Sequence, residues 1–505
     1  MRRKRTIYFN DARHYYLFVF EPPMAMEDAW RPIDEVAGTG VDTLSYGVER
    51  GDGLFYPSKV GMRFGADIQP FEQAAYWRLW HNMQSLIDRG LDPLTVLIDR
   101  AQEKGMEFFA SLRLGCYGEM DLAHNTRTGG RGFMLPEVRR HVGDVLEELA
   151  ADYDTDGVEL DFAAPPGGAS LYFQEQDIKT GTSIMTDWAR EVAATLRGRR
   201  PKSFQIGARV YPTEEINLSV GVDVRTMLRE RLVDFVVPMV YGHHLLDSGM
   251  PIDWLIEAAH ASDIAVYPML QPYYHDEGRR FHTVGHATPA MMRAAAATYW
   301  DKDADGMYTW FLDWPLGDAG RQVLSELDDP DLVRKGDKHY IVSRRSASYD
   351  LMGMPAPLPI EIAADDRGTR HNISFHVADD FDEEADRGAR LMINITDVVA
   401  ADRISFWLNG QPLDAETCLR SYAGSVAPYA GQWLEFDLSG VKPKRGQNLL
   451  EIALESRPED LVGPLIIEDV ELQVESEPGK GLPRETRTPA AKWADTRTMD
   501  VRSWR

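Results

Sequence analysis

The feature that most constrains the fold is a regular alternation of short apolar runs with longer amphipathic runs, which continues to about Asp331. Short apolar runs are typical of buried strands, and the longer runs repeat apolar residues at helical spacing. The predicted strands are Tyr15–Phe20, Val41–Val48, Met106–Leu114, Gly157–Phe162, Phe204–Tyr211, Phe235–Tyr241, Ile264–Tyr273 and Gly306–Leu312. The predicted helices include Glu27–Ala37, Ala74–Arg89, Pro93–Lys104, Pro136–Ala151, Ile184–Gly198, Val224–Arg231, Ile252–Ala261 and Pro289–Trp300. This series predicts an α/β fold, a (β/α)8 TIM barrel formed by residues 1–340.

The pattern changes after Tyr340, where helical periodicity stops and short alternating runs begin. The predicted strands of this region are Pro359–Ile362, Ile373–His376, Arg390–Ile395, Arg403–Leu408, Trp433–Leu438, Leu449–Leu454 and Ile466–Val474. Turn residues separate them, and Asn409-Gly410 favours a tight hairpin. Residues 341–475 are therefore predicted to form an all-β sandwich. For the tail, residues 476–505, we expect disorder rather than an arm laid over another surface.

The composition excludes several classes of protein. A net charge of −25 argues against a nucleic-acid partner, because phosphate backbones require basic surfaces. Cys116 and Cys418 fall in different predicted domains, so no disulfide framework is expected. No segment reaches the apolar length that a membrane span needs. The basic start, Met1–Arg5, is not followed by an uninterrupted apolar region, which predicts a cytoplasmic protein or export without a recognisable signal peptide. The oligomeric state stays unknown.

The strand Gly157–Phe162 combines an apolar face with an acidic one. Side chains alternate along a strand, so Val158, Leu160 and Phe162 share one face. Glu159 and Asp161 share the other face, which in a barrel points at the axis, near the carboxyl end where active sites are built. Two buried acids are costly unless they are paired or used. A site that cleaves or binds a sugar is the leading interpretation.

Polar and aromatic residues near the other strand ends suit a carbohydrate, because aromatic rings cover its C–H faces and polar groups bond its hydroxyls. The candidates for substrate binding are Arg113, Arg209, Tyr211, Tyr241, His243, Gln271, Tyr273 and Trp310. The alternative is that Arg113, Arg209, Glu159 and Asp161 form only a buried ion network.

Three segments resemble the barrel of the chitinase-like, family-18 glycoside hydrolases. Asp156-Gly-Val-Glu-Leu-Asp161-Phe is similar to the acidic signature of strand four. Val237-Pro-Met-Val-Tyr241 resembles strand six, and Gly306-Met-Tyr-Thr-Trp310 resembles the last strand, whose Trp lies under the sugar. The chain departs from the signature at Ala163, where the family has its proton-donating Glu. Hypothetical bacterial glycosyl-hydrolase-like barrels share the Gly-Val-Glu-Leu-Asp-Phe type of strand, and the C-terminal region is similar to accessory jelly-roll domains.

The leading hypothesis is therefore a glycoside hydrolase that uses paired carboxylates. Asp161 is the central carboxylate, and Glu159 tunes its pKa or serves as the second one. The candidates for a partner across the barrel are Asp313, Asp276 and Glu277. The alternative is a glycan-binding barrel without catalysis, which Ala163 favours. A metal-dependent hydrolase using His243, His244, His275 and Asp276 is a further alternative, although no spaced metal motif supports it and no cofactor is expected.

Overall fold

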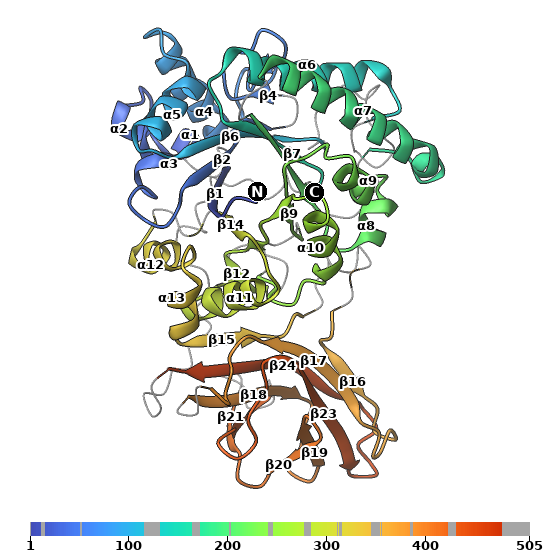
Figure 1. Ribbon diagram of the computed structural model, residues 1–505. Coiled ribbons are helices and arrows are strands. Elements are labelled where there is room, and N and C mark those ends of the chain that lie inside the picture. The colour runs from blue at the N-terminus through green and yellow to red at the C-terminus, as the bar shows by residue number, and fades with distance from the viewer. Residues whose placement is uncertain are drawn as a thin grey trace.

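The structure of the protein is a computed structural model. This structure describes residues 2–11, 16–50, 53–115, 132–163, 172–200, 204–240, 246–276, 284–310, 312, 316–344, 354, 356–383, 387–422 and 431–476. The fold is of the mixed α/β type, with one curled parallel sheet surrounded by helices and separate antiparallel sheets below it (Figure 1).

The parallel sheet has nine strands in the order β10-β9-β8-β7-β6-β2-β1-β14-β11. They are β1 (Arg5–Asp11), β2 (Thr43–Gly47), β6 (Glu107–Arg113), β7 (Gly157–Asp161), β8 (Gln205–Val210), β9 (Phe235–Pro238), β10 (Ala265–Val266), β11 (Met269–Leu270) and β14 (Gly306–Trp310). Only Tyr267 and Pro268 separate the two terminal strands, β10 and β11. The Tyr267 N–H donates to Val236 O at 3.0 Å, and the Tyr308 N–H donates to Pro268 O at 3.1 Å. Both ends of the strand order thus meet in one short segment.

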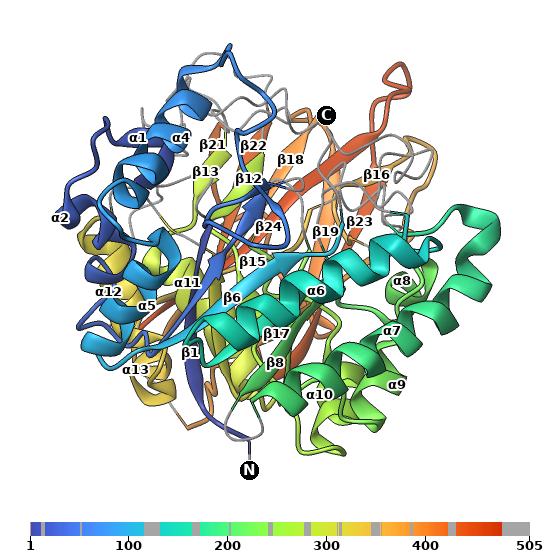
Figure 2. The same ribbon diagram turned by 90° about the horizontal axis from the view of Figure 1, so that it is seen from above.

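Helices lie around the outside of the curled sheet (Figures 1 and 2). They are α1 (Tyr16–Val19), α2 (Met26–Ala29), α3 (Arg31–Asp34), α4 (Ala74–Ile87), α5 (Pro93–Glu103), α6 (Pro136–Asp152), α7 (Ile178–Arg199), α8 (Glu214–Ser219), α9 (Val224–Arg229), α10 (Asp253–His260), α11 (Pro289–Asp301), α12 (Asp318–Glu326) and α13 (Pro330–Lys335). Several begin at a side chain that accepts hydrogen bonds from the first turn. Asp92 caps α5 in this way, and Thr288 caps α11. No described helix has the length and apolarity to cross a membrane.

The predicted first strand, Tyr15–Phe20, is wrong. Tyr16–Val19 forms α1, which buries Tyr16, Leu17 and Phe18, while Tyr15 lies outside the described residues. The first strand is Arg5–Asp11. Its polar start concealed it, because Arg5 is buried through hydrogen bonds to Glu107 Oε2 at 2.8 Å and to Gln205 Oε1 at 2.6 Å. These partners come from β6 and β8, so the sequence around Arg5 alone does not reveal them.

The predicted strand Ile264–Tyr273 is interrupted, and its last part belongs to a separate hairpin. This hairpin pairs β12 (Tyr273–Asp276) with β13 (Val284–His286). A second small sheet, of β3 (Glu49–Arg50), β4 (Gly53–Leu54) and β5 (Met62–Arg63), follows β2. Both extend connections that leave the carboxyl ends of parallel strands.

The C-terminal region forms two antiparallel sheets. One has the order β15-β24-β18-β22-β21, with β16 also paired to β24, and the other has the order β17-β23-β19-β20. The strands are β15 (Lys338–Ile341), β16 (Ile360–Ile362), β17 (His371–Val377), β18 (Gly388–Thr396), β19 (Arg403–Leu408), β20 (Gln411–Leu413), β21 (Leu419–Tyr422), β22 (Gln432–Asp437), β23 (Gly446–Ser456) and β24 (Leu465–Glu475). Asn409 and Gly410 join β19 to β20 with φ of 52° and 78°, which confirms the predicted hairpin.

Candidate active site

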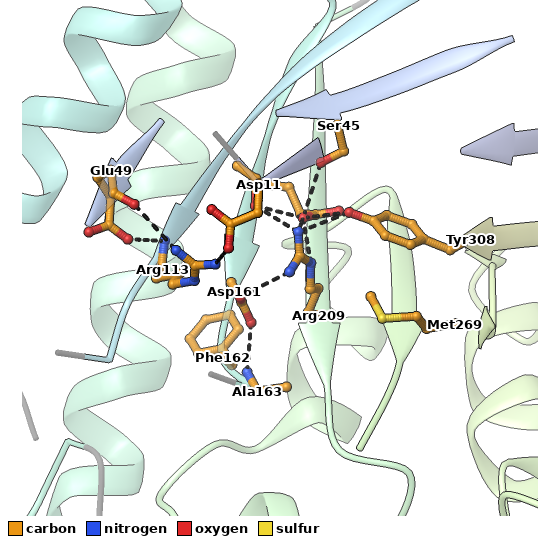
Figure 3. A network of polar contacts seen from close by, with 12 residues as sticks. Asp11, Ser45, Glu49, Arg113, Asp161, Phe162, Ala163, Arg209, Met269 and Tyr308 are labelled. Carbon is orange, nitrogen blue, oxygen red and sulfur yellow. Dashed lines mark hydrogen bonds and ion pairs between the residues drawn. The ribbon is translucent and has the colours of Figure 1, made fainter. Parts of the chain in front are cut away.

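Arg209 lies at the centre of the candidate site, inside the curled sheet (Figure 3). It projects from β8 and is fully buried between two acids of the neighbouring β7. Its Nε donates to Glu159 Oε1 at 2.7 Å, and its Nη1 donates to Asp161 Oδ2 at 3.1 Å. The structure therefore brings the three predicted residues together, because Asp161 and Arg209 are register partners and Glu159 lies one pleat deeper.

Two glycines and two aromatic rings shape the layer below this network. A Cβ at Gly207 would lie 2.2 Å from the ring of Phe235, and one at Gly157 would lie 2.4 Å from the ring of Phe109. The two rings meet edge to face with centroids 5.3 Å apart. The glycines therefore leave the space that these rings fill, and the charged groups above them rest on an apolar floor.

Glu159 is fixed by hydroxyl groups as well as by Arg209. Its Oε1 accepts from Ser111 Oγ at 2.8 Å, from Tyr308 OH at 3.1 Å and from Ser45 Oγ at 3.3 Å. These donors come from β6, β14 and β2, so with Arg209 of β8 and Glu159 of β7 itself, one carboxylate oxygen ties five strands together. Tyr308 was not predicted as part of the site.

Aromatic rings cover the guanidinium of Arg209. Its Cζ lies 3.7 Å from the ring centroid of Phe9 and 5.8 Å from that of Trp310. Burial alone would lower the pKa of Arg209, but Glu159, Tyr308 and Asp161 raise it above its ordinary value. Arg209 therefore stays charged and is held by both carboxylates and rings.

Asp161 is the acid closest to the carboxyl end of β7, and its side chain is fully buried. Its Oδ1 accepts a hydrogen bond from the backbone N–H of Ala163 at 3.1 Å. Burial raises the pKa of Asp161 above its usual value, although Arg209 and Arg113 act in the opposite direction. Ala163 thus contributes a backbone group that orients Asp161, and its methyl side chain offers no proton.

A second buried ion pair lies beside the first. Arg113 of β6 is ion-paired through Nη2 with Asp11, the last residue of β1. The backbone N–H of Arg113 donates to Glu49 Oε1 at 3.2 Å, and Nη1 of the Arg113 side chain donates to Glu49 O at 3.3 Å. Asp11 and Glu49 were not among the residues predicted from the sequence. Correct placement of β1 would have identified Asp11, because it then ends an inner strand as Asp161 does.

Two further predicted residues present polar atoms that hydrogen-bond to no described residue. The hydroxyl of Tyr211 and the Oε1 of Gln271 are both buried in this way. Burial and the Asp161 carboxylate raise the pKa of Tyr211. Gln271 Nε2 donates to Val240 O at 3.3 Å. A buried polar atom without a partner is costly, so these two atoms are the best placed to bind a ligand.

The predicted aromatic platform is packed into the interior. Trp310 is fully buried, and its ring centroid lies 4.8 Å from that of Phe9. Tyr273 is 2% exposed and meets the ring of His286 with centroids 5.0 Å apart.

Several candidates cannot be placed. Tyr241, His243, Glu277 and Asp313 lie outside the described residues, and Asp276 is described only by its backbone in β12. Within the described ranges, no group of three or more His, Cys, Asp or Glu side chains could hold a metal ion. His243 and His244 lie outside the described ranges.

No model of a known protein family matches the chain, and no curated protein matches its sequence. Its fold is similar to solved glycoside hydrolases. α-L-Fucosidase isoenzyme 2 from Paenibacillus thiaminolyticus is 13% identical at a TM-score of 0.41, over 65% of this chain and 49% of that one. The spore cortex-lytic enzyme SleL of Bacillus megaterium is 11% identical at a TM-score of 0.39, over 65% of this chain and 74% of that one. A bacterial fucosidase with an iminocyclitol inhibitor is 10% identical at a TM-score of 0.39, over 89% of this chain and 94% of that one. This chain thus spans about half the length of the first of these enzymes.

Proposed function

We propose that this protein is a glycoside hydrolase whose reaction takes place at the carboxyl end of β7, with Asp161 as the central carboxylate. The observation that carries the proposal is the environment of Asp161. It is a buried acid at the end of a parallel strand with a raised pKa, and its charge also raises the pKa of Tyr211, whose buried hydroxyl bonds to no described residue.

We further propose that the curled sheet is a closed (β/α)8 barrel, and that the antiparallel sheets form an accessory β-sandwich. The bonds of Tyr267 and Pro268 to both neighbouring strands support closure. The predicted boundary at residue 340 cuts through β15, which pairs with β24. A boundary just before Lys338 therefore fits the pairing better.

The two acids of β7 have different roles in this proposal. A glycosidic bond breaks through a transition state with positive charge on the sugar. A carboxylate that is stripped of water interacts strongly with such a charge, so Asp161 suits the nucleophile or the group that stabilises the transition state. Glu159 lies deeper and already accepts four donors at Oε1. It acts as a positioning residue that holds Arg209 against Asp161.

The second carboxyl has to come from another strand, because Ala163 cannot supply a proton. The Asp11 carboxylate is already engaged in an ion pair with Arg113, so we do not assign this role to it. We keep Asp313, Asp276 and Glu277 as the candidates for this role. The distance between the second carboxyl and Asp161 sets whether the anomeric configuration is retained or inverted.

The test is hydrolysis of a panel of fluorogenic glycosides and oligosaccharides by the full chain. Asp161→Asn should lower kcat/KM by about 100-fold or more, because a charge that stabilises the transition state is lost. The matched control is Asp156→Asn at the opposite end of the same strand, where the amide can still accept the bond from the Phe108 N–H. Equal activity of Asp161→Asn and the control would refute the site.

A second candidate function is glycan binding without catalysis. It is favoured by the pairing of the buried acids Asp11, Glu159 and Asp161 with arginines, together with Ala163. Sugar binding with no product from any substrate of the panel would support it. Activity that disappears with a chelator and returns with added metal would instead support the metal-dependent alternative.

A further inference from the structure

A surface pocket of about 340 Å³ lies in the antiparallel region, far along the chain from Asp161. The connection between β18 and β19, the start of β22 and the connection between β23 and β24 form its walls. In Figure 2 the connection between β23 and β24 projects at the upper right. Its volume is at the lower end of the range of about 300–1,000 Å³ that is typical of small-molecule sites.

Arg457 gives this pocket an unsatisfied donor. The residue is only 4% exposed, and its Nη2 donates to the backbone oxygen of Asp397. Its Nη1 and Nε have no hydrogen-bond acceptor among the described residues, and the Asp402 carboxylate lies 3.7 Å from Nε. Both nitrogens are covered by protein atoms at the wall of the pocket, and a buried N–H group without an acceptor costs free energy, so an acceptor that reaches them from the pocket is favoured.

The charges around the pocket define the ligand. Asp397 is exposed and lines the pocket, and Asp402 lies behind Arg457. The segments 397–403 and 457–464 carry four carboxylates (Asp397, Asp402, Glu459 and Asp460) against two guanidinium groups (Arg403 and Arg457), and this negative balance disfavours a carboxylate, sulfate or phosphate ligand. A hydroxyl group both donates and accepts hydrogen bonds, so it can bind to Arg457 and Asp397 at once.

The rest of the lining is apolar and partly exposed. Val399, Leu461 and Pro464 line the pocket, and Val399 is 38% exposed. Val462, next to Leu461, is 82% exposed, more than any other large hydrophobic residue described as exposed. Apolar side chains beside polar groups match the two kinds of surface that a sugar ring presents.

We propose that the Arg457 pocket binds a neutral sugar, independently of whether the site at Asp161 cleaves a glycosidic bond. Arg457 donates to a sugar hydroxyl, Asp397 accepts from one, and Leu461 and Val399 contact the C–H face of the ring. The pocket gives the protein a second point of attachment to a glycan, on the antiparallel sheets.

Hydrogen–deuterium exchange of the full chain tests this, because the readout is local. The probes are the methyl glycosides of neutral hexoses and 6-deoxyhexoses, with glucuronate as the charged comparison. A neutral sugar should slow amide exchange in residues 397–402 and 457–464. Arg457→Gln should weaken this protection by about tenfold, the size expected when a charged hydrogen bond is lost. Leu461→Trp, which fills the pocket from a half-buried loop position, should abolish it and carries the test if Arg457→Gln does not fold.

The controls separate this pocket from the site at Asp161. Arg403→Gln removes an exposed arginine that, among the described residues, bonds Ala400 O and Asp402 O, and it should leave the protection unchanged. Asp161→Asn should also leave it unchanged, even if it abolishes hydrolysis. The proposal is overturned if no neutral sugar protects these segments, if only glucuronate does, or if protection survives Leu461→Trp.

Discussion

Arg209 in the parallel sheet and Arg457 in the antiparallel region are both almost completely buried, but their surroundings differ. Arg209 bonds two carboxylates, Ser111 and Tyr308, and a ring of Phe9 covers its face. Arg457 has one backbone acceptor and a distant carboxylate. The first arginine therefore organises a finished network, in which a ligand meets Asp161 rather than the guanidinium. The set of hydrogen bonds around Arg457 is incomplete, and in our proposal its guanidinium is itself the group that binds the ligand.

The largest expected difference is in stability. Arg209→Met leaves Glu159 and Asp161 buried without their cation, and it should lower the free energy of unfolding by about 3–5 kcal/mol. Arg457→Met removes one hydrogen bond and a longer ion pair, so the loss should be about 1–2 kcal/mol. Urea unfolding followed by circular dichroism measures both. Equal losses would show that the two arginines are equally well satisfied and would remove the contrast between them.

A pair of tyrosines extends the comparison within the parallel sheet. Tyr308→Phe removes the hydroxyl that bonds Glu159 and Arg209, and it should cost about 1–2 kcal/mol of stability. Tyr211→Phe removes a buried hydroxyl without a described partner, so stability should be unchanged or slightly higher.

The same two variants should rank in the opposite order when hydrolysis is measured. Tyr211→Phe should weaken substrate binding, seen as a higher KM, whereas the active fraction of Tyr308→Phe should keep its KM. A stability loss in Tyr211→Phe as large as that in Tyr308→Phe would mean that its hydroxyl is already satisfied in the free protein.

The smallest expected effect concerns pH. The pKa of Asp161 is raised on folding, so its protonated form is the one that folding favours. Its contribution to stability is present below its usual value of 3.8 and is lost as the pH rises through the folded-state pKa. Asp161→Asn removes this dependence. The stability of the variant relative to the wild type should therefore increase from about pH 3.5 to about pH 7, a range that spans the titration of a carboxylic acid. Urea unfolding across this range measures the difference. A difference that stays constant with pH would mean that Arg209 and Arg113 fully offset burial.

The sequence predicted which acids and arginines of the candidate site lie on the inner faces of their strands. The alternation of side chains along a strand was sufficient to place Glu159 and Asp161 on one face, and the same reasoning selected Arg113 and Arg209. It could not predict which side chains form hydrogen bonds or ion pairs with one another, since that depends on the register between distant strands. Tyr308 was overlooked for this reason, and Asp11 was overlooked because the polar residues of β1 made that strand look unlike a buried one.

The C-terminal strands illustrate the same limit at larger scale. Their alternation predicted most of them, and the Asn409-Gly410 turn fixed one hairpin. The short strand Lys338–Ile341 was not predicted, because its partner, β24, is more than a hundred residues later in the chain. Buried Lys338 concealed it further, since its ammonium pairs with Asp379 Oδ1 at 2.9 Å. Local pattern therefore identifies strands, but it does not identify which of them lies at the centre of a sheet.

The position of β24 has a consequence for how the chain is made. Three strands, β15, β16 and β18, pair with it, yet it follows all three in the chain and so leaves the ribosome after them. The parallel sheet, by contrast, has all its strands by Trp310. During synthesis the N-terminal region can fold while β15, β16 and β18 still lack β24 as a partner. Their unpaired strand edges are then prone to wrong pairing. A chain that stops before Leu465 would keep every residue of the candidate active site and would still expose these edges to other molecules.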